Sequence, residues 1–210
     1  MKLPVQYLYI VFLWILWCAL HSFLISITVT EYLKKKFGAW FRFYRLFFNA
    51  VSLLTLIPVV YYSFSLQGAA VFTWDGGWVM VKYALFVISI SLFVAGGRHY
   101  SMAQFLGMRQ IKTNRANRTL SAYDTFDSSG ILGVIRHPWY LAAILVVWAR
   151  DISLLSFLIN IIIDTYIVIG AHLEERKLLR EFGTRYREYQ KRVSMFIPYK
   201  WLKGKIARLF

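Results

Sequence analysis

Two short motifs in the C-terminal half contain residues able to do chemistry. The first reads Arg-His-Pro-Trp-Tyr over residues 136–140, where a polar segment meets an apolar one. The second opens with the adjacent carboxylates Glu174 and Glu175, at the end of another apolar segment. A guanidinium and an imidazole can bind an anionic group, and a carboxylate accepts hydrogen bonds and balances positive charge. The alternative is an interfacial belt around Arg136 and solvated glutamates that pair with nearby Arg and Lys.

Two further polar residues lie inside apolar segments. His21 lies within the first such segment, and Asp164 interrupts the last. A carboxylate facing lipid would cost about 2.5–3.5 kcal/mol, so Asp164 is expected to face the protein interior. Its candidate partners are Arg98, His99 and Arg136. The catalytic group stays open, with Arg136, His21 and Asp164 as candidates.

No metal site is expected. Among the four histidines and the single cysteine, only Cys18 and His21 have close spacing on one segment, at i and i+3. A lone cysteine also excludes a disulfide scaffold.

The composition indicates an integral membrane protein. Of 210 residues, 59% are hydrophobic and only 17% are charged, whereas soluble domains average nearer 25% charged. The net charge of +15 would suit nucleic acid, but the basic residues cluster between apolar stretches that no soluble surface could carry. We therefore expect the lipid bilayer, and no nucleic acid, as a partner.

The apolar segments predict an all-α polytopic bundle. Three full transmembrane helices are expected within residues 3–30, 46–68 and 76–97. Residues 137–149 and 152–173 are expected to form a helical hairpin with its tip at 150–153, since 13 helical residues rise only about 20 Å. A separate amphipathic helix is expected from Glu174 to about Val193. This gives about five membrane helices and a cytoplasmic C-terminal helix.

The distribution of charge predicts organisation and topology. The chain divides into a transmembrane region (1–97), a cytoplasmic loop region (98–136) and a C-terminal hairpin with binding helices (137–210), all in one integrated domain. Basic residues number five in 31–45, six in 98–136 and eleven in 174–210, which is 22 of 25 on one side of this topology. The positive side is cytoplasmic, so the N-terminus is expected outside and the C-terminus inside.

The two motifs and their spacing resemble the isoprenylcysteine carboxyl methyltransferase and phospholipid methyltransferase superfamily. The resemblance rests on residues 136–140, 174–179 (Glu-Glu-Arg-Lys-Leu-Leu), 182–186 (Phe-Gly-Thr-Arg-Tyr) and 196–198 (Phe-Ile-Pro). The N-terminal half resembles a bacterial branch, the NnrU-like proteins and methanethiol S-methyltransferases. There the matching residues are 20–22 (Leu-His-Ser), 43–49 (Phe-Tyr-Arg-Leu-Phe-Phe-Asn) and 105–110 (Phe-Leu-Gly-Met-Arg-Gln).

The resemblance implies an S-adenosylmethionine-dependent methyltransferase of a bacterial inner membrane, acting on a small thiol or a hydrophobic or lipid acceptor. It also implies which residues would bind the cofactor: His137, Pro138, Tyr140, Leu141, Glu174, Glu175 and Tyr186.

Two other functions remain open. One is an NADPH-dependent membrane reductase resembling steroid 5α-reductases, with the basic residues of 109–118 binding a 2′-phosphate. The other is a non-enzymatic membrane assembly factor.

Overall fold

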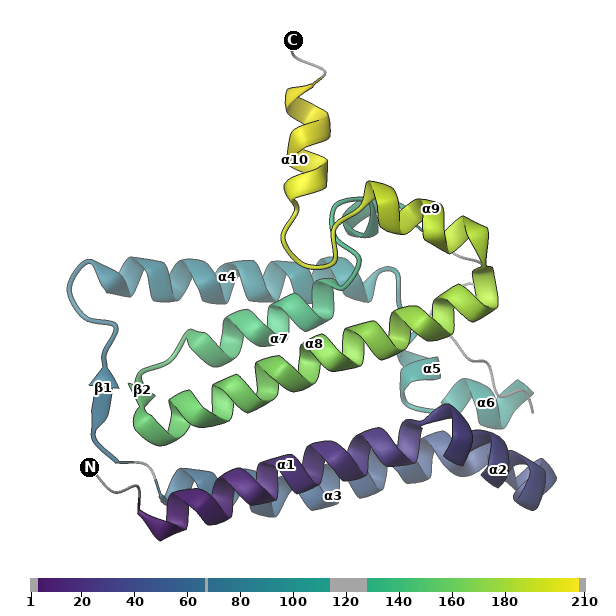
Figure 1. Ribbon diagram of the computed structural model, residues 1–210, viewed down its shortest axis with the longest axis horizontal. Helices are drawn as coiled ribbons and strands as arrows, with labels where there is room; N and C mark the ends of the chain where they lie inside the picture. The colour runs from purple at the N-terminus through teal and green to yellow at the C-terminus, as the bar shows by residue number, and fades with distance from the viewer. Residues whose placement is uncertain (1–3, 67, 114–127, 208–210) are drawn as a thin grey trace. The chain divides into compact units, whose positions relative to one another are not determined.

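Helices make up most of the computed structural model, which describes residues 4–66, 68–113 and 128–207 (Figure 1). Four helical segments among these residues are long and apolar enough to cross a membrane: Val5–Ile25, Ile27–Ser65, Trp78–Gly97 and Leu154–Phe182. Pro138–Trp148 is a shorter apolar helix. The chain is an all-α polytopic membrane protein, as the sequence predicts. Its topology and its three-part division along the sequence stay predictions.

The first predicted helix is divided in two. Helix α1 (Val5–Ile25) ends at Ser26, whose ψ of 150° is extended, and α2 (Ile27–Phe37) follows at once. Ser26 caps α2 because its Oγ accepts a hydrogen bond from the backbone N–H of Val29 at 3.3 Å. A 3₁₀ turn, η1 (Gly38–Phe43), leads into α3 (Tyr44–Ser65). Helix α4 (Trp78–Gly97) is the third predicted span.

The predicted helix boundary at Glu174 is wrong. Helix α8 (Leu154–Phe182) has 29 residues and includes both glutamates. It ends just before Gly183, whose φ is +54°. A positive φ is accessible to glycine at little cost, so the break falls there and α9 (Thr184–Arg192) follows. The predicted hairpin tip contains a short strand, β2 (Ile152–Ser153), which pairs antiparallel with β1 (Ala70–Phe72).

The chain packs as two compact units. Unit 1 takes its described residues from 1–73, 102–118 and 151–166, and unit 2 from 74–101, 119–150 and 167–210. Helix α8 therefore contributes its first part to unit 1 and its second part to unit 2.

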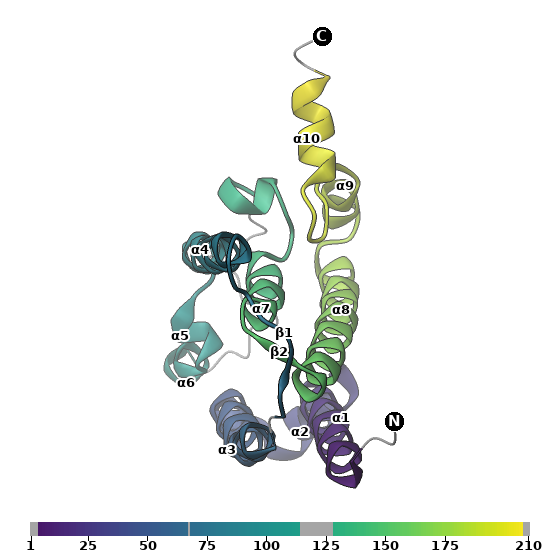
Figure 2. The same ribbon diagram turned by 90° about the vertical axis from the view of Figure 1, so that its left-hand side faces the viewer.

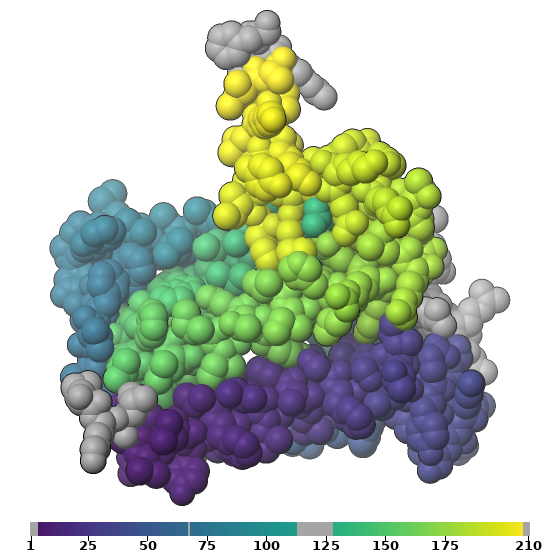
Figure 3. Space-filling model, in the orientation of Figure 1, coloured from purple at the N-terminus to yellow at the C-terminus, as the bar shows by residue number. Residues whose placement is uncertain are grey.

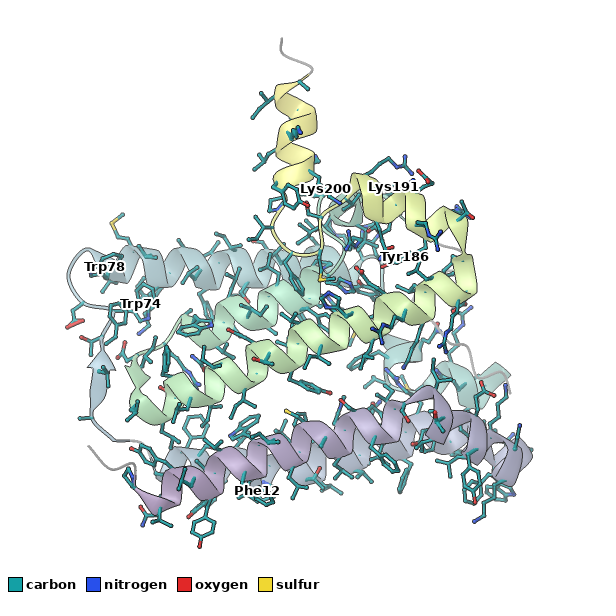
Figure 4. All side chains as sticks on the ribbon, viewed as in Figure 1. Phe12, Trp74, Trp78, Tyr186, Lys191 and Lys200 are labelled. Atoms are coloured by element: carbon teal, nitrogen blue, oxygen red, sulfur yellow. The ribbon has the colours of Figure 1, made fainter. Side chains whose placement is uncertain are left out.

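The core of unit 1 joins α1, α3 and the start of α8. Its buried members are Ile10, Trp14, Val59, Leu155 and Ile159. The indole N–H of Trp14 donates to Ser63 Oγ at 3.0 Å, which satisfies a polar atom in this apolar setting. Outward-facing side chains such as Phe12 are exposed, as expected for a surface that meets lipid (Figure 4).

Two of the sequence motifs meet in unit 1. Arg45 Nε and Asn49 Nδ2, both on α3, donate to the carbonyl oxygen of Phe105 at 3.2 and 2.9 Å. Phe105 ends α5 (Met102–Phe105), and α6 (Met108–Thr113) follows. Gly107 between them has φ +88°, and a Cβ there would lie 2.9 Å from the backbone nitrogen of Leu46. The motif residues of 43–49 and 105–110 thus fasten α5 to α3.

In unit 2, α4 packs against α7 (Pro138–Trp148). The indole N–H of Trp139 donates to the carbonyl of Phe93 at 2.9 Å, and the two rings stack at 5.1 Å. A Cβ on Gly96 would lie 2.7 Å from Trp139 Cδ1, so only glycine allows this approach. Ser89 Oγ donates to the carbonyl of Ala142 at 2.8 Å. These contacts hold the start of α7, and with it the Arg-His-Pro motif.

Candidate functional site

The Arg-His-Pro motif is held by the C-terminal segment of unit 2. Ile135 and Ser194 form a parallel β-bridge, in which the N–H of Arg136 donates to Ser194 O at 2.9 Å. The N–H of His137 donates to Met195 O at 3.2 Å. Pro138 then opens α7 at its first position, where a missing N–H costs nothing. The motif therefore lies between an isolated β-bridge and the start of a helix.

Glu175 is the centre of a buried polar network. Its Oε1 accepts from Arg136 Nε at 2.6 Å and lies 3.1 Å from His137 Nε2. Its Oε2 accepts from the side-chain amide of Gln190 at 2.7 Å. The Arg136 and Glu175 side chains are only 8% and 7% exposed. Both carboxylate oxygens are therefore already bound to groups of the protein itself.

Arg136 also binds the backbone of the following segment. Its NH1 donates to the carbonyl of Gln190 at 3.3 Å and to that of Val193. The guanidinium therefore connects α8, α9 and the segment after α9. Because burying an unpaired charge is very costly, this set of partners explains how a cation persists there.

Glu174 has a different environment from its neighbour. Its side chain is 31% exposed, and its Oε2 lies 3.8 Å from His137 Nδ1. Successive residues on a helix point about 100° apart, so one glutamate can face inward while the other lies at the edge. Glu174 is consequently the more accessible of the two carboxylates.

Aromatic rings surround His137. The ring of Tyr140 stacks on it with 5.3 Å between centroids and 5° between planes, and Phe196 lies at 6.0 Å. His137 is buried, whereas Tyr140, Leu141 and Phe196 are half-buried. An apolar and aromatic surface therefore adjoins the two carboxylates.

Tyr186 and Tyr189 close the network from α9. Tyr186 lies between α9 and the last turns of α8 (Figure 4), is buried, and has its ring 5.6 Å from that of Tyr189. Burial, reinforced by the negative charge of Glu175, raises the pKa of Tyr186 above its ordinary value. The Tyr189 hydroxyl donates to the carbonyl of Leu132 at 2.6 Å. The Tyr186 phenol is therefore neutral, and the rings of Tyr186 and Tyr189 pack against the α9 side of the network.

The structure brings most of the candidate residues together in unit 2, but not all. Arg136, His137, Glu174 and Glu175 are in contact, with Tyr140 stacked on the imidazole. Pro138 is fully buried, which suits a packing role. The candidates His21 and Asp164 belong to unit 1.

In unit 1, His21 has a specific partner. Its Nδ1 lies 2.5 Å from the hydroxyl of Tyr166, and its ring lies 4.8 Å from that of Phe48 and 5.2 Å from that of Trp17. His21 is therefore paired with a polar group inside unit 1. Asp164 is half-buried, with its Oδ1 sealed from solvent.

Sequence reasoning missed Gln190 and Tyr166. Both side chains form hydrogen bonds with candidate residues, at separations of 15 and 145 positions along the chain. Neither belongs to a pattern that marks chemistry in a single sequence. Half of the basic segment proposed for a 2′-phosphate lies outside the described residues, and of its four basic residues the structure describes Arg109 and Lys112. Arg109 NH1 donates to Gln104 Oε1 at 3.2 Å.

No group of three or more His, Cys, Asp or Glu that could hold a metal ion occurs among residues 4–66, 68–113 and 128–207.

A protein-family model described as "NnrU protein" matches residues 9–151, about two thirds of the chain. The chain belongs to the NnrU family. The match includes the Arg-His-Pro motif and stops before Glu174. The NnrU-like branch suggested by the N-terminal motifs is therefore confirmed.

The NnrU-family chain is also similar to curated proteins. It is 33% identical over 125 residues to a protein named methanethiol S-methyltransferase 1 from Bradyrhizobium diazoefficiens, covering 59% of this chain and 39% of that protein. Over 124 residues it is 32% identical to a methanethiol S-methyltransferase from Pseudomonas deceptionensis, covering 58% and 42%. The chain spans about two fifths of the length of these relatives. No solved structure matches it.

Proposed function

We propose that the chain is an integral membrane methyltransferase that uses S-adenosylmethionine to methylate a small thiol or a hydrophobic acceptor. The observation that carries this proposal is the difference in environment between the two adjacent glutamates. Glu175 is occupied by Arg136, His137 and Gln190, whereas Glu174 remains accessible beside a stacked His137–Tyr140 pair. The similarity to proteins named methanethiol S-methyltransferase supports the reaction class.

The residues present fit this cofactor chemically. S-adenosylmethionine carries an amino group and a ribose diol, which a carboxylate binds well, and a positively charged sulfur, which an aromatic ring attracts. Glu174 would accept hydrogen bonds from the amino or ribose groups, and Tyr140, Leu141 and Phe196 would contact its less polar parts. When bound, the cofactor supplies a methyl group activated by the positive sulfur.

The remaining residues of the site have positioning roles in this proposal. Glu175 orients the guanidinium of Arg136 and the imidazole of His137 in one fixed arrangement. Pro138 starts α7 at this point, and Tyr186 and Tyr189 exclude water from the α9 side of the network. Methyl transfer from a sulfonium depends chiefly on alignment in a dry site, so a rigid and water-poor surround is what the reaction requires.

Equilibrium binding to the purified full chain in detergent tests this proposal. S-adenosylmethionine should bind, and NADPH should not. Glu174→Gln should weaken binding about 10- to 150-fold, because hydrogen bonds to a charged group contribute about 1.5–3 kcal/mol. Glu188→Gln is the matched control, since Glu188 is an exposed carboxylate of α9 that pairs with Lys191. Binding of NADPH instead, or an unchanged affinity in Glu174→Gln, would contradict the proposal.

Transfer of labelled methyl from the cofactor should then be measured with methanethiol and with longer alkyl thiols. Product with a thiol supports the proposed acceptor class. Cofactor binding without methyl transfer to any thiol would support the cofactor site and refute a thiol as the acceptor.

A further inference from the structure

Helix α10 (Tyr199–Ile206) carries an apolar face that no described residue covers. Tyr199, Leu202 and Ile206 lie at i, i+3 and i+7, which places them along one side of the helix. They are 58%, 47% and 55% exposed. Figure 3 shows α10, in yellow, projecting from the rest of unit 2. A stripe of this kind in a membrane protein needs an apolar partner.

The charges beside the stripe have one sign. Lys203 and Lys205 flank it on either side at helical spacing, and Lys205 Nζ lies 5.6 Å from the Trp201 ring centroid. No Asp or Glu occurs anywhere between Val193 and Ala207. Lysines beside an apolar stripe, with a tryptophan, are the pattern of helices that lie in an anionic membrane surface.

The direction of α10 agrees with such a position. Figure 1 and Figure 2 both show α10 running across the direction of α4 and α7, which belong to the same unit. Helix α4 is long and apolar enough to cross the membrane, so a helix that runs across its direction extends along the membrane plane. Eight residues are also too few to span the hydrocarbon layer.

The base of α10 is fixed at the depth where the polar and apolar segments meet. The ring of Phe196 lies 6.0 Å from that of His137, at the start of α7. The N–H of Lys200 donates to Ser194 Oγ at 3.1 Å, and its Nζ donates to the carbonyl of Gln190 at 2.7 Å (Figure 4). Lys200 is therefore held within the fold, whereas the side chains of Lys203 and Lys205 are exposed.

We propose that α10 lies in the membrane–water interface, with Tyr199, Leu202 and Ile206 buried among acyl chains and Lys203 and Lys205 bound to anionic lipid headgroups. This partner is an anionic lipid surface, and the inference does not depend on the proposed methyl transfer. A basic residue near an anionic surface strengthens binding about fivefold, so the two lysines together contribute about 25-fold.

Spin labels on the full chain test this placement. Cysteines replace Ile206 or Gly204 in a Cys18→Ser background, and the chain is placed in nanodiscs of phosphatidylcholine alone or with an equal part of phosphatidylglycerol. With phosphatidylglycerol, the label in Ile206→Cys should collide with oxygen dissolved in the lipid and be shielded from a water-soluble nickel reagent. The label in Gly204→Cys should show the reverse, because residue 204 lies opposite the stripe.

Adding Lys203→Gln and Lys205→Gln should reduce the shielding of the Ile206→Cys label to the level seen in phosphatidylcholine alone. Lys34→Gln with Lys35→Gln removes the same charge from the exposed end of α2 and should leave the shielding unchanged. Equal access of the nickel reagent to both labels in anionic nanodiscs would overturn the proposal. So would shielding that persists in detergent together with dipolar broadening between labels, because a second copy of the chain would then cover the stripe.

Discussion

Replacing Glu175 by alanine should lower the free energy of unfolding far more than replacing its neighbour Glu174. The substitution removes an acceptor shared by Arg136, His137 and Gln190. It leaves the guanidinium of Arg136, whose side chain is 8% exposed, without its carboxylate. Breaking a buried ion pair from one side costs about 3–5 kcal/mol, because the remaining charge stays buried. Such a loss shifts the unfolding equilibrium at least a hundredfold.

Glu174→Ala is the matched comparison. The Glu174 side chain is 31% exposed and lies 3.8 Å from His137 Nδ1, so its removal should cost under about 1 kcal/mol. The free energy of unfolding can be measured by titrating sodium dodecyl sulfate into mixed micelles and following helix content by circular dichroism. The same preparations give the affinity for S-adenosylmethionine. Glu174→Ala should lower affinity with little loss of stability, and Glu175→Ala should lower stability first.

A double-mutant cycle separates the pair from its surroundings. Arg136→Met together with Glu175→Leu removes both charges, and replacing a buried ion pair by apolar residues is often close to neutral. The double variant should therefore be more stable than the sum of the two single losses predicts, by about 0.5–3 kcal/mol. Equal stability of Glu174→Ala and Glu175→Ala, or strict additivity in the cycle, would refute the assignment of Glu175 as the buried partner of Arg136.

Three further outcomes follow from the packing and the charge pattern. Gly96→Ala should destabilise the protein by about 1–3 kcal/mol, because the new Cβ would lie 2.7 Å from Trp139 Cδ1. Gly97→Ala is the control: its Cβ would lie 3.9 Å from the same ring, so thermal unfolding should hardly change. Tyr166→Phe removes the hydroxyl 2.5 Å from His21 Nδ1 and should lower the free energy of unfolding by about 0.5–1.5 kcal/mol, measured in the same micelle titration. Cysteine labelling in a Cys18→Ser background tests the topology. The predicted orientation exposes cysteines at Ser128 and Lys203 on the cytoplasmic side and a cysteine at Val71 on the outside. Labelling of Ser128→Cys and Lys203→Cys from opposite sides would contradict that orientation.

The distribution of apolar and charged residues was sufficient to predict the membrane bundle. Runs of about 20 or more uncharged residues have one stable solution in a bilayer, a helix that satisfies its own backbone. The ends of helices α1, α3 and α4 were therefore predictable to within about five residues, although α2 and η1 before α3 were not predicted. Helix α8 was predicted too short, because Glu174 and Glu175 look like the start of a surface helix. Arg136, His137 and Gln190 satisfy Glu175 inside the fold, so α8 continues to Phe182.

The roles within the candidate site were decided by tertiary structure. Sequence alone determined that an Arg-His pair and a Glu-Glu pair occur at the ends of apolar segments, since residue type and spacing are local properties. Which carboxylate is buried depends on the rotation of α8 against the strand-like segment at Ile135 and Ser194, which local pattern does not specify. Gln190 and Tyr166 became visible for the same reason, because their partners lie 15 and 145 residues away along the chain and only folding brings them within hydrogen-bond distance.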